Sequence, residues 1–129
     1  MEKKIAFITG ASSGIGKACV KYLAAEGFAI IACGRREERL AELKDSLPKD
    51  TDYHYLVFDV RDKKAVYEAI DSLPDQWKNI TVLINNAGNA HGLDFIQDGS
   101  EDDWDAMMDI NVKGLLYVSK KIIPGMVER

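Results

Sequence analysis

Three glycines and two serines stand close together in TGASSGIG, residues 9–16, directly after the apolar run 5–8. Glycine lets a backbone turn tightly and approach a ligand, and a helix beginning there offers free N–H groups and its positive dipole end to an anion. The serine side chains can cap that helix or donate hydroxyls to a phosphate. The spacing G-x-x-x-G-x-G after an apolar run predicts a dinucleotide pyrophosphate site, and a tight turn without a ligand is the alternative.

Two arginines, Arg35 and Arg36, follow a second apolar run. At this position a dinucleotide-binding fold that takes NAD carries an acid for the ribose 2′-hydroxyl. An acid would repel a 2′-phosphate, whereas a guanidinium pairs with it bidentately. Cations at the start of a helix oppose its dipole and therefore need a compensating use. The pair favours NADP over NAD, and a solvated helix start is the alternative.

Alternating apolar and amphipathic segments must position these residues. The apolar runs predict strands over 3–9, 28–34, 53–60 and 80–88. The amphipathic segments predict helices over 15–27, 36–48, 62–74 and 100–126. Strands this apolar are buried on both faces, so we expect a Rossmann-like, doubly wound α/β fold with the parallel sheet order 3-2-1-4. The buried face expected for the first helix is made of Ile15, Cys19, Val20 and Leu23.

The composition narrows the classes of function. A chain of 129 residues with 47% hydrophobic content can bury one ordinary core, and its net charge of −4 argues against a nucleic-acid-binding surface. No stretch reaches the ~18 apolar residues of a membrane span. Cys19 and Cys33 lack metal-ligand spacing and are expected to be reduced thiols. We expect a cytoplasmic protein without a metal site, whose partners include neither nucleic acid nor a membrane.

The opening T-G-x-x-x-G-I-G of the first helix resembles the short-chain dehydrogenase/reductase family, and three further motifs agree with it. NNAG, residues 85–88, ends the fourth predicted strand, where that family carries the same motif. Asp59 and Val60 end the third strand, where the family's aspartate meets the adenine ring. Asn111, in DINVKG, lies midway along the next helix, where the family has its catalytic-site asparagine.

The resemblance covers the whole chain, and segments 33–47 and 123–129 are similar to the family's NADP-dependent 3-hydroxy acid dehydrogenases, which act on serine and allo-threonine. It implies an oxidoreductase that transfers a hydride between the nicotinamide of NADP and a small hydroxy or oxo substrate, such as a 3-hydroxy acid. Asn111 is the catalytic-site residue that it implies. The implied cofactor-binding residues are Gly10, Ser12, Ser13, Gly14, Ile15, Gly16, Arg35, Arg36, Asp59, Val60, Asn86, Ala87 and Gly88.

In the resembled family the catalytic serine, tyrosine and lysine come later, in a part that would lie beyond Arg129. We therefore expect residues 1–129 to be the N-terminal, NADP-binding portion of a longer homo-oligomer, a dimer or tetramer, and to be inactive alone. The fourth strand would then be an exposed apolar edge. The apolar stripe expected to lie uncovered on the last helix is Met107, Ile110, Leu115, Val118 and Ile122. A non-catalytic module that binds NADP or a partner is the alternative.

Tyr117 and Lys121 spell the family's Y-x-x-x-K signature, but they lie on the same helix as Asn111 and before any fifth strand. We interpret them as a helical i, i+4 pair rather than as catalytic residues.

Four further side chains have plain interpretations. Ser100 is expected to cap the last helix rather than to take part in a metal site. His91 follows the NNAG motif and is either a substrate contact or an ordinary loop residue. Trp77 and Trp104 are expected to be packing residues.

Overall fold

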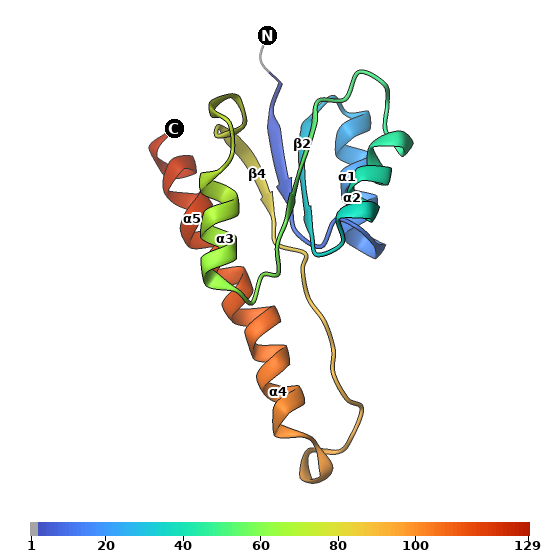
Figure 1. Cartoon of the computed structure of the whole chain (residues 1–129), viewed down its shortest axis with the longest axis vertical. Coiled ribbons are helices and arrows are strands. Elements are labelled where there is room, and N and C mark those ends of the chain that lie inside the picture. The colour runs from blue at the N-terminus through green and yellow to red at the C-terminus, as the bar shows by residue number, and fades with distance from the viewer. Residues whose placement is uncertain (1–2) are drawn as a thin grey trace.

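Four parallel strands form one sheet in the order β3-β2-β1-β4, which confirms the expected order (Figure 1). The computed structural model describes residues 3–129. The strands are β1, Ile5–Ile8; β2, Ala29–Gly34; β3, Tyr53–Val57; and β4, Ile80–Ile84. Because β1 pairs with both β2 and β4, its carboxyl end lies centrally in the sheet, at the point where the glycine-rich turn begins.

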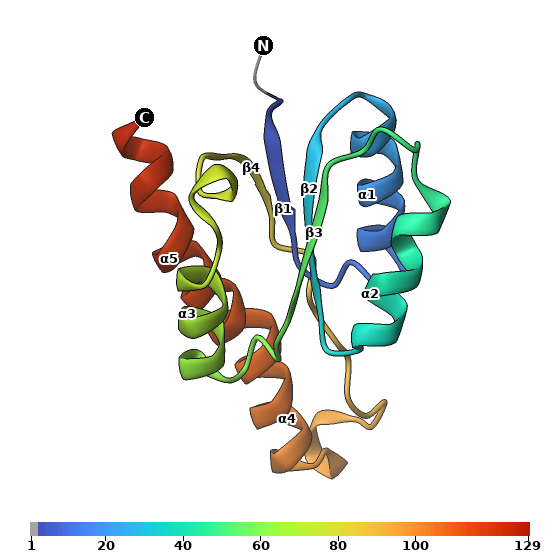
Figure 2. The ribbon, with the colours of Figure 1, turned by 45° about the horizontal axis from the view of Figure 1, so that its top comes forward.

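Helices cover both faces of the sheet (Figures 1 and 2). One face carries α1, Gly14–Ala25, and α2, Glu37–Leu43; the other carries α3, Lys63–Asp71, and α5, Leu115–Glu128. Short 3-10 turns occupy Lys44–Ser46, Asp75–Trp77 and Ile96–Asp98. Successive strand residues point to opposite faces, so alternate positions of β1 and β2 fill two separate core layers.

The last helical span contains three segments: α4, Glu101–Met108; a π-helical segment, Asp109–Gly114; and α5. The sequence predicts one uninterrupted helix over 100–126, whereas the structure places a wider π turn at its centre. Ser100 caps α4 by accepting a hydrogen bond from the Asp103 N–H at 3.4 Å. At Gly114 a Cβ atom would lie 2.7 Å from Cγ2 of Val60, so the glycine permits a close approach of the π segment to the turn that follows β3.

The expected buried face of α1 is wrong at Ile15, which is 77% exposed. The face that packs on the sheet is made of Gly16, Val20 and Ala24. Gly16 decides which side of α1 faces the sheet, because only a residue without a side chain can pack against the turn that precedes the helix.

Burial also differs from expectation in the sheet and in α5. β1 is buried throughout and β2 is buried at every residue but Gly34, whereas β3 and β4 are the partly exposed edges of the sheet. β3 ends at Val57 instead of continuing to residue 60. The stripe expected to lie uncovered is largely covered, since Ile110, Val118 and Ile122 pack against α3 and the sheet. Leu115 of that stripe is 41% exposed, as expected, and the same helical span also exposes Met108, Val112, Leu116, Ile123 and Val127.

Candidate cofactor site

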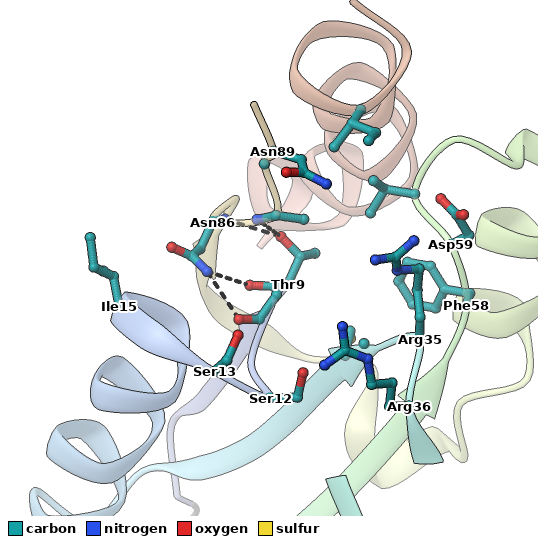
Figure 3. Close-up of a pocket in the computed structure, with 17 residues that line it drawn as sticks. Thr9, Ser12, Ser13, Ile15, Arg35, Arg36, Phe58, Asp59, Asn86 and Asn89 are labelled. Atoms are coloured by element: carbon teal, nitrogen blue, oxygen red, sulfur yellow. Dashed lines mark hydrogen bonds between the residues drawn. The ribbon is translucent and has the colours of Figure 1, made fainter. Parts of the chain in front are cut away.

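A cavity of about 320 Å³ lies at the carboxyl ends of the strands, beside the glycine-rich turn (Figure 3). In an open α/β sheet, this edge is where ligands bind. The sequence-predicted residues that line it are Gly10, Ser12, Ser13, Ile15, Arg35, Arg36, Asp59, Val60, Asn86, Ala87 and Gly88. Gly14, Gly16 and Asn111 are not among the lining residues, and each has a supporting position instead.

The glycine-rich turn requires its glycines for two separate reasons. Gly10 and Gly14 have φ angles of +61° and +56°, a region that side-chain-bearing residues rarely adopt. A Cβ atom at Gly16 would overlap the carbonyl oxygen of Gly10 and the side-chain amide of Asn86. Gly16 therefore lets the first turn of α1 pack directly on the turn that feeds it.

A hydrogen-bond network ties this turn to the loop after β4. Thr9 Oγ1 accepts from the backbone N–H groups of Asn86 at 3.0 Å and Ala87 at 2.9 Å. Asn86 Nδ2 donates in return to the carbonyl oxygens of Thr9 at 3.2 Å and Gly10 at 3.0 Å (Figure 3). Two walls of the cavity, separated by more than seventy residues of sequence, are thereby held as one unit.

The start of α1 has the properties of an anion site. Ser13 occupies the N-cap position, yet its side chain makes no capping hydrogen bond, so its hydroxyl remains available as a donor. The first N–H groups of a helix have no partner within the helix and carry the positive end of its dipole. Ser12 and Ser13 both line the cavity next to these groups (Figure 3). A pyrophosphate fits this combination of backbone and hydroxyl donors.

Arg35 and Arg36 follow the last residue of β2 and line the cavity on the side of Ser12 (Figure 3). Both side chains are exposed. Within residues 3–129 neither guanidinium forms a hydrogen bond or an ion pair with another side chain. Both positive charges are therefore available to an anionic ligand.

Asp59 is the one carboxylate among the residues described as lining the cavity. Its Oδ2 lies 2.7 Å from Nη2 of Arg61, the shortest contact of that ion pair. The hydrogen bonds from the Arg61 side chain lower the pKa of Asp59, with smaller contributions from the Arg61 backbone N–H and the charge of Arg35. Asp59 is therefore an ionised acceptor at neutral pH.

Asn111 lies inside the π segment and fixes the loop after β4. Its Oδ1 accepts from the backbone N–H of Asn89, and its Nδ2 donates to the Asn89 carbonyl oxygen, both at 2.8 Å. A Cβ atom at Gly88 would lie 3.0 Å from Asn111 Oδ1, so a larger residue there would press on the Asn111 side chain where the loop passes the helix. In this structure Asn111 positions the loop after β4. The π segment that carries Asn111 is of a kind that recurs at functional sites.

Sequence reasoning missed six residues that line the cavity, namely Thr9, Cys33, Gly34, Phe58, Asn89 and Ile110. Cys33, Phe58 and Ile110 are buried apolar residues of the core whose edges also form the cavity wall. Nothing in their local pattern distinguishes them from other core residues. Thr9 lies directly after β1 and belongs to the same TGASSGIG segment as the predicted residues, and it is 1% exposed here.

The Y-x-x-x-K pair lies away from the cavity. Lys121 Nζ is 2.7 Å from a carboxylate oxygen of Asp71 and 5.4 Å from the ring centre of Tyr67, so it joins α5 to α3. Tyr117 packs against the core. Both side chains have structural positions, and the contacts given for Lys121 are to α3 rather than to Tyr117.

The remaining candidate side chains divide between core and surface. Trp77 packs on the core and against the His54 ring, at 5.4 Å between ring centres, whereas Trp104 is 38% exposed and covers Gly99. His91 Nε2 is buried without a hydrogen-bond partner.

Among residues 3–129 no group of three or more His, Cys, Asp or Glu residues is arranged to hold a metal ion. No helix in that range has the length and apolarity needed to cross a membrane.

Known proteins resemble this chain over nearly its whole length. The short chain dehydrogenase family model matches residues 4–129. The NADP-dependent 3-hydroxy acid dehydrogenase of Escherichia coli K12 is 43% identical over 125 residues, which are 97% of this chain and 50% of the relative. Sulfoacetaldehyde reductase 2 of Chromohalobacter salexigens is 44% identical over 124 residues, which are 96% of this chain and 49% of the relative.

A solved structure of serine dehydrogenase, in its closed form complexed with NADP+, matches with a TM-score of 0.91. It is 43% identical in sequence, and the match covers 97% of this chain and 50% of that chain. The chain thus spans about half the length of the curated relatives it matches.

Proposed function

Because the chain belongs to the short chain dehydrogenase family, we propose that its cavity at the carboxyl ends of the strands binds NADP. The observation that carries this proposal is the meeting of two features in one cavity. The glycine-rich turn offers donors to a pyrophosphate, and Arg35 and Arg36 stand where an NAD-binding site would carry an acid. A guanidinium pairs well with the 2′-phosphate that distinguishes NADP from NAD.

The protein is proposed to be an NADP-dependent oxidoreductase, with residues 1–129 as its cofactor-binding N-terminal portion. NADP supplies or accepts a hydride at its nicotinamide ring when bound. The residues of this chain hold the cofactor, and Asn111 fixes the loop beside it through its two hydrogen bonds to Asn89. The proposed substrate is a small hydroxy or oxo compound, and 3-hydroxy acids are favoured by the similarity to the Escherichia coli dehydrogenase.

Homo-oligomer formation is part of the proposal. The exposed side chains of Met108, Val112, Leu116, Ile123 and Val127 form an apolar stripe along the last helical span. Exposed apolar side chains that gather on one element mark an interaction site in many proteins. A sedimentation measurement on the native protein should therefore show a dimer or tetramer, and a monomer at all concentrations would contradict this part.

Equilibrium titration of the native protein with NADP+ and NAD+ tests the cofactor assignment. We expect NADP+ to bind at least ~10-fold more tightly, a difference of about 1.4 kcal/mol. Equal affinities, or a preference for NAD+, would contradict the assigned role of the two arginines. Oxidation of NADPH with 3-oxo acids, followed by the loss of reduced-nicotinamide absorbance, tests the reaction. Tight NADP+ binding without any turnover would favour the non-catalytic alternative.

A further inference from the structure

The loop after β4 is held from three separate elements of the fold. Asn86 bonds to the turn after β1, and Asn89 bonds to Asn111 in the π segment. A third bond stands at the start of the loop, where Nδ2 of Asn85 donates to Oγ of Ser119 at 3.0 Å. Asn85 follows β4 directly, and Ser119 lies within α5, 34 residues further along the chain. The loop is therefore tied to α5 as well as to the turn and the π segment.

The bond between Asn85 and Ser119 lies outside the cavity. Neither residue lines it, although the four residues that follow Asn85 all do. Both residues are half-buried, so water competes for this bond only in part. Among residues 3–129 the side chain of Asn85 has no other hydrogen-bond partner. The orientation of the Asn85 side chain thus depends on Ser119.

The position of Ser119 is rigid because α5 packs into the core. Val118, its neighbour in the chain, is fully buried, and Ile122, close to one turn further on, is 4% exposed. A side chain carried by a packed helix holds its partner more precisely than one carried by a loop. The amide of Asn85 is thereby fixed at the point where the backbone leaves β4 and enters the cavity wall.

We propose that Ser119 is a positioning residue for the cofactor, an inference that rests on the proposed function. Through Asn85 it sets the direction in which the loop leaves β4, and so places the backbone of Ala87 and Gly88 in the cavity wall. The strand β1 separates β2 from β4, so this loop and the arginines after β2 stand on opposite sides of the glycine-rich turn. The role of Ser119 is therefore independent of the 2′-phosphate, and it applies equally to NADP+ and NAD+.

Calorimetric titration of the native protein and its variants with NADP+ and NAD+ tests this inference. We expect Ser119→Ala to weaken the binding of both cofactors by about 5-fold, which corresponds to the net contribution of one hydrogen bond. The loss arises because a loop released at Asn85 has to be ordered when the cofactor binds. The number of binding sites per chain and the ratio of the two affinities should stay unchanged.

Three further variants separate positioning from a general loss of stability. Ser119→Thr keeps the hydroxyl group and should retain most of the native affinity. Ser72→Ala is the matched control, because it removes a hydroxyl that donates to the Ala69 carbonyl oxygen at 2.6 Å, at the end of α3, and it should leave both affinities unchanged. The double variant of Asn85→Ala and Ser119→Ala should bind NADP+ no more weakly than Asn85→Ala alone, since both substitutions break the same bond.

The outcomes separate this inference from the proposed function. Failure of the unaltered protein to bind NADP+ would overturn both together. Native affinity in Ser119→Ala, combined with a lower midpoint of urea unfolding, would show that the bond supports only the fold and would overturn the inference alone. Additive losses in the double variant, or an equal loss in Ser72→Ala, would overturn it as well. A loss in Ser119→Ala that Ser119→Thr restores would support it.

Discussion

Replacing Thr9 with valine removes one hydroxyl group while nearly preserving the shape of a fully buried side chain. Thr9 is 1% exposed, and its Oγ1 accepts from two backbone N–H groups, of Asn86 at 3.0 Å and of Ala87 at 2.9 Å. A buried donor left without a partner costs about 1–3 kcal/mol. Both loop residues are half-buried, so the lower end of that range applies to each donor. We expect the free energy of unfolding to fall by about 2 kcal/mol.

Urea unfolding of the native protein, followed by far-ultraviolet circular dichroism, measures this loss as a lower midpoint with an unchanged slope. Thr9→Ser is the matched control, because it keeps the acceptor and removes only a methyl group, worth about 0.8 kcal/mol. The valine variant should therefore be the less stable of the two. If the serine variant is the less stable, methyl packing rather than the two hydrogen bonds holds the loop, and the reasoning is refuted.

Three further predictions concern the turn, the arginines and a half-buried histidine. Arg35→Glu should raise the dissociation constant for NADP+ by at least ~10-fold and that for NAD+ less, and equal changes in a calorimetric titration would contradict the role of Arg35. Gly16→Ala should abolish NADP+ binding, because the added methyl group would overlap the turn before α1. At Gly14 an added methyl group meets nothing within 4 Å, so Gly14→Ala should cost only about 1–2 kcal/mol of backbone strain. Thermal unfolding and binding assays on both variants check this contrast. Burial lowers the pKa of His54 below its ordinary value of 6.5, so the unfolded chain binds more protons and stability should decrease as the pH falls below about 6.5. His54→Phe should remove that slope, and a slope that survives would assign it to other groups.

The class and order of the elements could be predicted from the sequence because each signal is local. Apolar runs and amphipathic segments alternate four times, and a parallel sheet covered by helices is the arrangement that buries both. The glycine-rich turn and the arginines after β2 could be located for the same reason, since short motifs at strand ends mark the ligand edge of such a sheet. Burial was harder to predict, as Ile15 and the stripe of Ile110, Val118 and Ile122 show.

What the sequence by itself determined was therefore the chemistry available at each strand end: donors after β1, cations after β2, an acid after β3 and amides after β4. Only the tertiary structure decided how those groups are held. The bonds of Thr9 to Asn86 and Ala87 and of Asn111 to Asn89 join segments far apart in the chain, and no local pattern encodes such a pairing. The pairing of Arg61 with Asp59 is close in sequence, yet the place of Asp59 in the cavity wall depends on the pairing of β2 with β3. The propensity of a segment to form a helix or a strand is set by neighbours along the chain, whereas the geometry of a site is set by contacts between segments that are far apart in the chain.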